Sequence, residues 1–213
     1  AISFESTEVK FKLDEHGKPI GVYTKERKDA HKLIEDLMLL ANKKVAEFVA
    51  KKQKGKNRLT FVYRSHDAPN EQTLMGFAQF ALKFGYKIDT SSGRETARSL
   101  NHLMEDVEGK KEQNVLTNLA IRSMAKAVYT TKSHSHYGLA FDYYTHFTSP
   151  IRRYPDVMAH RLLAHYLADG KSVNAEEYEK MCLHSSQMEK KAADAERGSI
   201  KYKQAEYLQD NIG

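Results

Sequence analysis

The chain has 213 residues and a formal net charge of +6, with 40% hydrophobic and 29% charged residues. This hydrophobic content suffices for one sizeable core or two small ones without disulfides or structural metals. The single cysteine, Cys182, excludes an internal disulfide and indicates a reducing, cytoplasmic compartment. No apolar run approaches the roughly 20 residues of a membrane span, so we expect no membrane association. The positive charge favours a polyanionic partner, but only weakly, because many basic proteins bind no nucleic acid.

The first elements in chain order are a β-hairpin and a long helix. Val9, Phe11 and Leu13 alternate with polar residues, and the alternation resumes after a turn that contains Gly17. Asp29 then begins an amphipathic helix, which we expect to be a core helix. Its expected inward positions are Leu33, Ile34, Leu37, Met38, Ala41, Val45 and Phe48.

A strand and three helices follow. Residues 59–63 are β-branched and aromatic, which predicts a strand. Asn70 is the expected N-cap of the next helix, and Ser92 opens a capping box for the helix after it. A third helix is expected over 116–127, after which serine, glycine and aromatic residues over 134–144 break the helical period.

Two helical regions close the chain. We expect Ser149 to be the N-cap of the first of these helices. In a helix that begins at Ser149, however, Pro155 lies beyond the first turn, where its missing N–H would leave a carbonyl without a donor. The helix should therefore kink or restart, leaving residues 151–154 as a separate turn. Asn174 is the expected cap of the last helix. Its expected small-residue seam comprises Tyr178, Met181, Cys182, Ser185, Met188, Ala192, Ala195 and Ser199.

The most informative segment runs from His136 to Arg161. It contains His-Tyr-Gly-Leu-Ala and then Tyr-Thr-His-Phe-Thr-Ser-Pro-Ile-Arg-Arg-Tyr-Pro-Asp. The adjacent Arg152 and Arg153 suit a phosphate, because guanidinium groups would join backbone N–H groups at the positive end of a helix dipole. Alternatively, the arginines pair with nearby acids such as Asp156. Helix geometry alone does not choose between these interpretations.

This segment resembles the signature of the ribonuclease II family catalytic domain, in which a His-aromatic-Gly motif precedes Ser-Pro-Ile-Arg-Arg-Tyr-Pro-Asp. The match is long and ungapped, and the overall pattern is closer to ribonuclease R than to ribonuclease II. Flanking matches extend it over nearly the whole chain: Glu26-Arg27, Asp29-Ala30-His31, Leu33-Ile34-Glu35, Met38, Ala41-Asn42, Tyr63-Arg64, His66, Pro69, Ser185-Ser186 and Ala195-Glu196-Arg197.

The resemblance implies a helix-rich α+β fold, with a small mixed or antiparallel sheet packed by helices. Residues 1–213 would form the C-terminal part of an RNB-type catalytic domain, as a fragment of a longer chain. The implied parent protein is a processive 3′ to 5′ exoribonuclease that hydrolyses RNA to nucleoside 5′-monophosphates with two Mg²⁺ ions. The family's metal ligands lie in an Asp-Pro-x-Asp-x-x-Asp-x-Asp-Asp run, which this sequence does not contain. We therefore expect Mg²⁺ to be bound by aspartates upstream, and the isolated chain to be inactive.

The resemblance also implies roles for individual residues. Arg152 is the expected phosphate-binding arginine, and Arg153 is a weaker candidate because relatives can carry lysine there. Glu35 and Glu196 correspond to family carboxylates that bind the terminal sugar or support the metal shell. The alternative for both is an ordinary solvent-exposed helical glutamate.

Two aromatic residues complete the expected RNA contacts. Tyr154 belongs to the signature, although packing under the arginine turn would explain it as well as substrate contact does. Phe4 lies near the position of a base-stacking aromatic, and core packing would explain it equally well.

The alternative function is a non-catalytic, helical RNA-binding or interaction domain. Zinc and nucleotide cofactors are not indicated, because the HEXXH, P-loop and Rossmann patterns are absent from the sequence. The sequence leaves the oligomeric state open, and truncation would expose surfaces through which the chain could self-associate.

Overall fold

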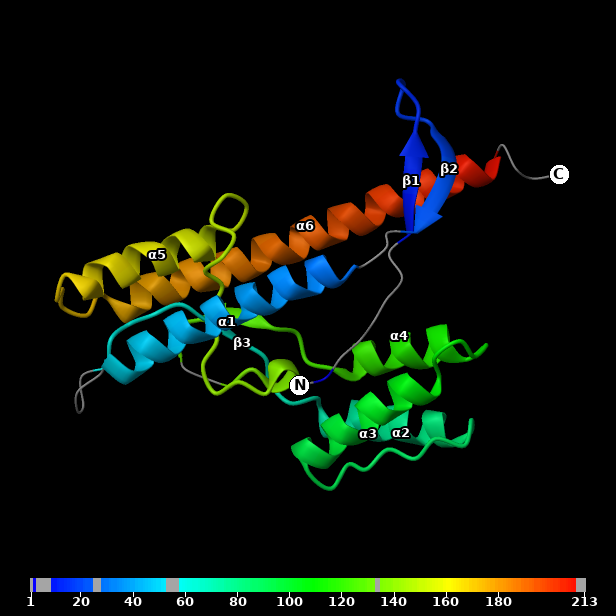
Figure 1. Cartoon of the computed structure of the whole chain (residues 1–213), viewed down its shortest axis with the longest axis horizontal. Coiled ribbons are helices and arrows are strands. Elements are labelled where there is room, and N and C mark those ends of the chain that lie inside the picture. Colours follow the sequence, from blue (N-terminus) through cyan, green and yellow to red (C-terminus); the bar gives the residue numbers. More distant parts are fainter. Residues whose placement is uncertain (1, 3–8, 25–27, 53–57, 133–134, 210–213) are drawn as a thin grey trace.

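The structure, a computed structural model, describes residues 2, 9–24, 28–52, 58–132 and 135–209. In Figure 1, helices α1, α5 and α6 run along one side of the molecule, a β-hairpin stands near the end of α6, and helices α2, α3 and α4 form a bundle below. The fold is therefore α+β and rich in helix, as expected. In chain order the elements are β1 (Val9–Leu13), β2 (Pro19–Thr24), α1 (Asp29–Lys52), β3 (Tyr63–Ser65), α2 (Glu71–Leu82), α3 (Gly93–Asp106), α4 (Gln113–Ser123), β4 (Val128–Thr130), a 3-10 turn (Tyr137–Leu139), α5 (Tyr154–Leu167) and α6 (Ala175–Gln209).

The predicted hairpin is confirmed, with β1 antiparallel to β2. Its turn is closed by the carboxylate of Asp14, which accepts hydrogen bonds from two backbone N–H groups of the turn. Gly17 takes a φ of 79° there, a conformation that residues with a Cβ avoid. The hairpin packs against the far end of α6, where the rings of Phe11 and Tyr207 lie 6.2 Å apart.

Helix α1 begins where predicted, but only part of its expected face is buried. Its buried residues are Asn42, Ala46 and Val49. Leu33 and Leu37, which we expected to point inward, are 61% and 52% exposed. The predicted inward positions Leu33, Ile34, Leu37 and Phe48 were wrong because they are exposed, whereas Met38, Ala41 and Val45 are partly buried, as expected. Small side chains on the 42–46–49 face allow close packing on the core, whereas no described element covers the leucine face.

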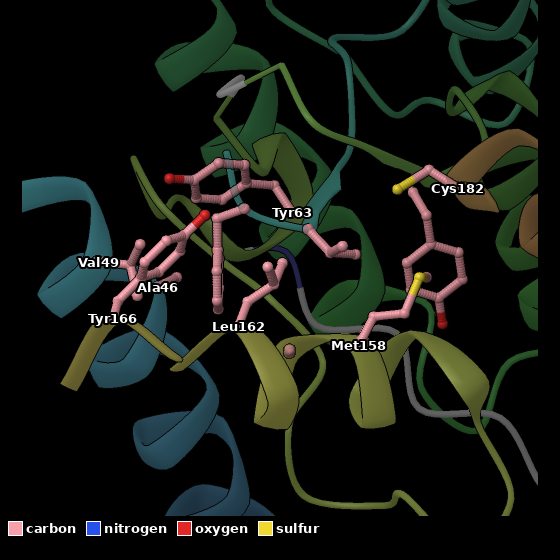
Figure 2. Close-up of a cluster of buried hydrophobic side chains, with 11 residues drawn as sticks. Ala46, Val49, Tyr63, Met158, Leu162, Tyr166 and Cys182 are labelled. Atoms are coloured by element: carbon pink, nitrogen blue, oxygen red, sulfur yellow. The ribbon is translucent and has the colours of Figure 1, made fainter. Parts of the chain in front are cut away.

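The first hydrophobic core lies where α1, α5 and α6 meet β3. Figure 2 shows that its side chains come from segments far apart in the sequence. Burial raises the pKa of the Cys182 thiol to about 12, so this cysteine is a core residue rather than a nucleophile. The labelled members, all at most 2% exposed, are Ala46, Val49, Tyr63, Met158, Leu162, Tyr166 and Cys182.

The strand predicted over residues 59–63 forms later and is shorter. Strand β3 begins only at Tyr63 and pairs with β4, which the sequence reasoning missed. The buried backbone before β3 bonds to side chains instead of a neighbouring strand. The Tyr166 hydroxyl donates to the Thr60 carbonyl at 2.7 Å, and the Thr145 hydroxyl donates to the carbonyl just before β3 at 2.6 Å.

Helices α2, α3 and α4 form a bundle with a core of its own. Asn70 and Ser92 cap α2 and α3 with their side chains, as predicted. Helix α4 ends at Ser123 rather than continuing to 127, because the chain turns extended before β4. The Tyr137 hydroxyl joins the bundle to the signature segment by donating to the Gly93 carbonyl at 2.9 Å. The bundle's core comprises Phe77, Ala81, Ile88, Leu100, Leu103, Val107, Leu116 and Ala120.

Helix α6 is capped as predicted but is buried over only part of its length. The Asn174 side chain accepts hydrogen bonds from two backbone N–H groups of the first turn. The expected seam is at least partly buried as far as Ser185, whereas Met188, Ala192, Ala195 and Ser199 are exposed. The second half of the seam was predicted wrongly, because α6 extends beyond the first core (Figure 1). None of the helices described is both long and apolar enough to cross a membrane.

Candidate nucleic-acid interface

The two adjacent arginines lie on a turn that precedes α5. The backbone N–H groups of Arg152 and Arg153 both donate to the Ser149 carbonyl, at 3.3 and 3.1 Å. Helix α5 begins only at Tyr154, with Pro155 in its first turn. The separate turn predicted from Pro155 is present at residues 150–152, but Tyr154, which we expected in the turn, begins α5. Ser149 is not the N-cap of α5, because the helix restarts after the turn and its N-cap is Arg153, without a side-chain cap.

A buried carboxylate holds this turn from inside. Asp156 is 0% exposed. It accepts hydrogen bonds from Nε and Nη2 of Arg153, both at 2.9 Å, and from the Ser149 backbone N–H at 2.7 Å. A buried carboxylate needs such partners to remain charged at a low free-energy cost. The ion-pair interpretation therefore holds for Arg153.

Arg152 differs from its neighbour in every one of these respects. Its side chain is exposed and makes no hydrogen bond or ion pair to another described residue. The residues on either side of the arginine pair, Ile151 and Tyr154, are 97% and 52% exposed. The turn therefore presents one unpaired guanidinium fork on a backbone that is fixed from inside. Such a fork matches two oxygens of a phosphate.

Asn42 ties α1 to the segment that leads into the turn. Its Oδ1 accepts hydrogen bonds from the backbone N–H groups of Phe147 and the following residue, at 2.9 and 3.2 Å. Its Nδ2 donates to the Tyr144 hydroxyl at 3.0 Å. Asn42 is 4% exposed, so all three bonds are sheltered from water. One residue of α1 thereby fixes the approach to the arginine turn.

A layer of aromatic and histidine side chains links β4, this segment and α6. The Tyr129 hydroxyl and Nδ1 of His146 lie 2.8 Å apart. Burial, followed by the nearby cations Arg153 and Arg64, lowers the pKa of His146 to about 3, so its ring is neutral at pH 7. The Arg64 guanidinium lies 4.5 Å from the Tyr129 ring centre and binds both carboxylate oxygens of Glu189, at 2.7 and 3.0 Å. This pair holds α6 beside β3.

The His-Tyr-Gly part of the signature forms a tight corner. Nδ1 of His66 accepts a hydrogen bond from the Gly138 backbone N–H at 2.9 Å, so its Nε2 carries the proton and donates to the Ala125 carbonyl at 2.8 Å. A Cβ on Gly138 would lie 2.9 Å from that Nδ1, which explains the glycine. Burial, together with the neighbouring His66, lowers the pKa of His136 to about 4. The His136 ring is therefore uncharged at pH 7.

A cavity of about 570 Å³ opens beside this corner. Its charged lining is entirely basic: Arg122, Lys126 and Arg197. The remaining lining residues are apolar or histidine. Arg197 also pairs with Asp194 and directly follows Glu196 on α6. An apolar cavity edged by cations suits a nucleotide, which combines a flat base with a phosphate.

The other expected site residues occupy separate elements. Glu35 lies on α1 and Glu196 on α6, and both side chains are exposed. Both helices pack against α5, the helix that follows the arginine turn. No hydrogen bond or ion pair joins Arg152 to Glu196. Tyr154 is half exposed at the start of α5, and Phe4 falls outside the described residues.

The residues present do not fit a metal site. Over the described ranges, no group of three or more histidine, cysteine, aspartate or glutamate side chains could hold a metal ion. Mg²⁺ takes near-octahedral coordination and is usually bound through carboxylates and substrate phosphates. Neither Glu35 nor Glu196 stands in such a cluster.

Comparison with known proteins decides the family. The RNB domain matches residues 1–169. The chain belongs to the RNB domain family. This RNB chain is 37% identical to Ribonuclease R 1 of Lactococcus lactis and 36% identical to Ribonuclease R of Aquifex aeolicus, in each case over all of its length. It spans only 26% and 30% of those two proteins.

Solved structures share the fold of this RNB chain. RNase R of Mycoplasma genitalium, in complex with ribose-methylated single-stranded RNA, gives a TM-score of 0.88 at 26% identity, over 100% of this chain and 33% of that one. The same enzyme is also known in complex with double-stranded RNA. Yeast Ssd1, a pseudonuclease, matches 75% of this chain with a TM-score of 0.63 at 23% identity, which shows the fold alone. Because a nuclease and a pseudonuclease share the fold, activity must be argued from side chains.

Sequence reasoning missed the basic cavity and the carboxylate–arginine pair that supports α6. The cavity's cations come from α4, the segment after it and α6, so no local pattern unites them. Arg197 alone gave a signal, as part of the Ala195-Glu196-Arg197 match. Glu189 gave none, because an exposed helical glutamate is the usual expectation.

Proposed function

We propose that residues 1–213 form the C-terminal part of a ribonuclease R type catalytic domain and supply one wall of its RNA channel. The protein that carries this domain would be a processive 3′ to 5′ exoribonuclease that releases nucleoside 5′-monophosphates. Membership of the RNB family and the similarity to ribonuclease R proteins support this proposal. RNA is the proposed partner, and the cytoplasm is the proposed compartment.

The observation that carries the proposal is the contrast between the two arginines. Arg153 neutralises Asp156, and Arg152 presents its guanidinium to solvent. A bidentate fork held on a fixed turn can bind the scissile or neighbouring phosphate and stabilise the charge that develops there. A lysine would make a single-point contact and would therefore fill this role less well.

The basic cavity supports RNA as the partner. Arg122, Lys126 and Arg197 would neutralise backbone phosphates, and the release of their counterions would make binding depend on salt. The apolar wall of the cavity would take a base. Glu196 precedes Arg197 on the same helix, so its proposed contact with the terminal sugar lies beside the proposed path of the strand. Glu35 and the side chains of Tyr154 and Phe4 are further proposed contacts.

The proposal places the metal ions outside this chain. Two Mg²⁺ ions, held by carboxylates that this sequence does not contain, would activate water and stabilise the leaving 3′ oxygen. The contribution of residues 1–213 would then be to bind and orient the RNA. The 213-residue chain alone should be inactive.

Replacing Arg152 in the full-length protein tests the role in turnover. We expect Arg152→Ala to lower kcat on a labelled single-stranded RNA by about 100-fold or more, with a much smaller change in RNA affinity, because the contact strengthens in the transition state. Arg152→Lys should recover only part of the loss. Arg98→Ala is the matched control, since Arg98 is an exposed arginine on α3. Unchanged turnover for Arg152→Ala would defeat the assignment.

A second candidate function is a non-catalytic RNA-binding or interaction domain, which is favoured by the lack of a metal-binding side-chain cluster among the described residues. Salt-dependent RNA binding by the 213-residue chain, together with no RNA degradation by the full-length protein in Mg²⁺, would support this candidate over the nuclease.

The exposed apolar face of α1 supports a further proposal, that the isolated chain self-associates. Leu33, Ile34 and Leu37 are each more than half exposed on this face. Light scattering after gel filtration should give a mass that rises with concentration. Leu33→Lys with Leu37→Lys should abolish that rise, and a concentration-independent monomer before substitution would exclude self-association.

A further inference from the structure

A second cavity, of about 590 Å³, lies near the start of α6. Its volume falls within the range of about 300–1,000 Å³ that is typical of small-molecule sites. It is separate from the interface described above, because Arg152, Glu35 and Glu196 do not line it. Glu179, on its wall, lies about 25 Å from Glu196 along the axis of α6, at a rise of about 1.5 Å per residue.

Two tyrosines supply the flat part of the lining. The ring centres of Tyr63 and Tyr143 lie 6.4 Å apart, with an angle of 45° between the ring planes. Tyrosine faces stack on heteroaromatic rings and discriminate little between bases. The Tyr63 hydroxyl is buried and has no hydrogen-bond partner among the described residues. Because Tyr63 is only 2% exposed, Tyr143 is the ring that a ligand in the cavity can reach.

Glu179 supplies a fixed acceptor on another side of the cavity. Its Oε2 accepts hydrogen bonds from the Thr131 backbone N–H at 2.6 Å and from both threonine hydroxyls, whereas Oε1 accepts only from the Thr130 hydroxyl, at 2.9 Å. Burial raises the pKa of Glu179, but the hydrogen bonds from Thr131 and Thr130 outweigh burial and hold it below its usual value. The carboxylate is therefore ionised and oriented, and Oε1 can still accept an N–H from the edge of a base.

Two cations stand at the same cavity. Arg58 and Lys132 line it, and neither side chain makes a hydrogen bond or ion pair to another described residue. Glu176, exposed in the first turn of α6, is the other acidic residue of the lining. Two unpaired cations beside an aromatic wall match a ligand in which a planar ring is joined to an anionic group.

We propose that this cavity binds a nucleotide, with the base against Tyr143, an N–H of the base toward Glu179, and the phosphate at Arg58 and Lys132. The site does not depend on the proposed nuclease activity. Two sources share this chemistry: a free nucleoside 5′-monophosphate and a nucleotide within an RNA strand.

Titration of the 213-residue chain tests the proposal. The four nucleoside 5′-monophosphates form one arm, and a five-residue single-stranded RNA forms the other. Tyrosine fluorescence reports directly, since the chain has 12 tyrosines and no tryptophan, and calorimetry gives the affinity. Lys132→Gln and Arg58→Gln should each weaken binding about fivefold or more, through the lost phosphate contact. Tyr143→Leu should weaken binding similarly, and Tyr143→Phe should restore it because the ring is kept.

Matched controls keep the result specific to this cavity. Lys44→Gln changes an exposed lysine on α1, and Tyr202→Leu changes a tyrosine that is 67% exposed, so both should bind as the parent does. Lys126→Gln tests the basic cavity near Glu196. Circular dichroism and the thermal midpoint show whether each variant is folded.

Each outcome decides the proposal. Monophosphate binding that Lys132→Gln weakens supports a free nucleotide as the ligand, and RNA binding alone with the same dependence supports a strand. The proposal is overturned if neither ligand binds at millimolar concentration, or if Lys132→Gln binds as tightly as the parent chain; weaker binding by Lys126→Gln would then place the ligand in the basic cavity. Failure here leaves the Arg152 test unaffected, because that test measures turnover of RNA by the full-length protein.

Discussion

The two hydrophobic cores of this chain differ in the polar groups buried around them. The core between α1, α5 and α6 adjoins Asn42, Thr145 and Asp156, whose hydrogen bonds fix the arginine turn. The bundle buries only Thr96 and Ser123 among its described polar residues, and their hydroxyls donate to nearby carbonyls of the same segment; the bundle reaches the signature segment through the Tyr137 hydroxyl. A polar network specifies one arrangement, whereas an apolar core tolerates several. The position of the exposed arginine is therefore set by the first core, and the bundle can vary around it.

The largest expected effect comes from the buried carboxylate of the first core. Asp156→Ala leaves the Arg153 guanidinium, with a side chain only 21% exposed, without its partner. Removing one partner of a buried ion pair typically destabilises a protein by about 3–5 kcal/mol. Urea unfolding followed by circular dichroism measures this change. Asp194→Ala, which breaks the exposed pair with Arg197, should change stability by less than about 1 kcal/mol. Similar values for the two variants would contradict the special role of the buried pair.

Core truncation in the bundle tests whether the two regions unfold separately. Leu100 is 0% exposed, so Leu100→Ala should destabilise the bundle by about 2–5 kcal/mol. Amide hydrogen exchange should then show lost protection in α2, α3 and α4 and retained protection in α1 and α5. Leu162→Ala, in the first core, is the matched control and should lower protection in α1, α5 and α6. Loss of protection throughout the chain in Leu100→Ala would show one cooperative unit and break the comparison.

The neutral histidines make the first core sensitive to acid. The pKa values of His146 and His136 are lowered to about 3 and about 4, below the unfolded value near 6.5. Between those values the unfolded state binds more protons, so stability is complete above about pH 6.5 and is lost as the pH falls. The slope is at most about 1.4 kcal/mol per pH unit for each histidine. Urea midpoints from pH 7.5 to 5 should follow this slope.

Single substitutions show which histidine causes the dependence of stability on pH. His146→Gln should flatten the dependence on pH, because one of the two proton-linked groups is removed. His16→Gln changes an exposed histidine of the hairpin turn and should leave the slope as it was. An equal slope in His146→Gln and the parent chain would exclude His146 as the source.

The smallest expected effect compares two buried tyrosines of the first core. Tyr63→Phe removes a hydroxyl that has no partner among the described residues, so stability should stay the same or rise by up to about 1 kcal/mol. Tyr166→Phe removes the donor to the Thr60 carbonyl and should destabilise the chain by about 1–2 kcal/mol. Thermal midpoints of the two variants measure the difference, and a larger loss for Tyr63→Phe would reverse the comparison.

Local signals predicted most of the helix starts, but not that of α5, for which Ser149 is not the N-cap. Asp29, Asn70, Ser92 and Asn174 each lie where a helix begins or is capped, because capping depends on residues a few positions apart. Burial was predicted less well. The leucine face of α1 has the stronger apolar pattern, yet the face around Asn42 is buried, since a distant segment supplies its hydrogen-bond partners. Strand β4 was missed because three residues carry too little alternation to be recognised.

The sequence predicted which residues form the candidate site, but not which of the two arginines is paired with a carboxylate. The signature located both arginines, and the sequence left phosphate binding and ion pairing open for each. Only the three-dimensional position of the Asp156 carboxylate, buried under the turn, separates Arg153 from Arg152. The basic cavity was not predictable, because its cations are brought together by long-range packing.

Because the single cysteine is buried in the first core, the reactivity of its thiol reports when α6 separates from that core. Cys182 is 0% exposed, and its thiol can react with a disulfide reagent only after α6 has moved away from the layer beneath it. The labelling rate therefore counts transient separations of α6, with no other thiol in the chain to confuse the signal. A ligand that holds α6 against its neighbours would slow the labelling of Cys182. The labelling rate would then report how much of the chain has ligand bound.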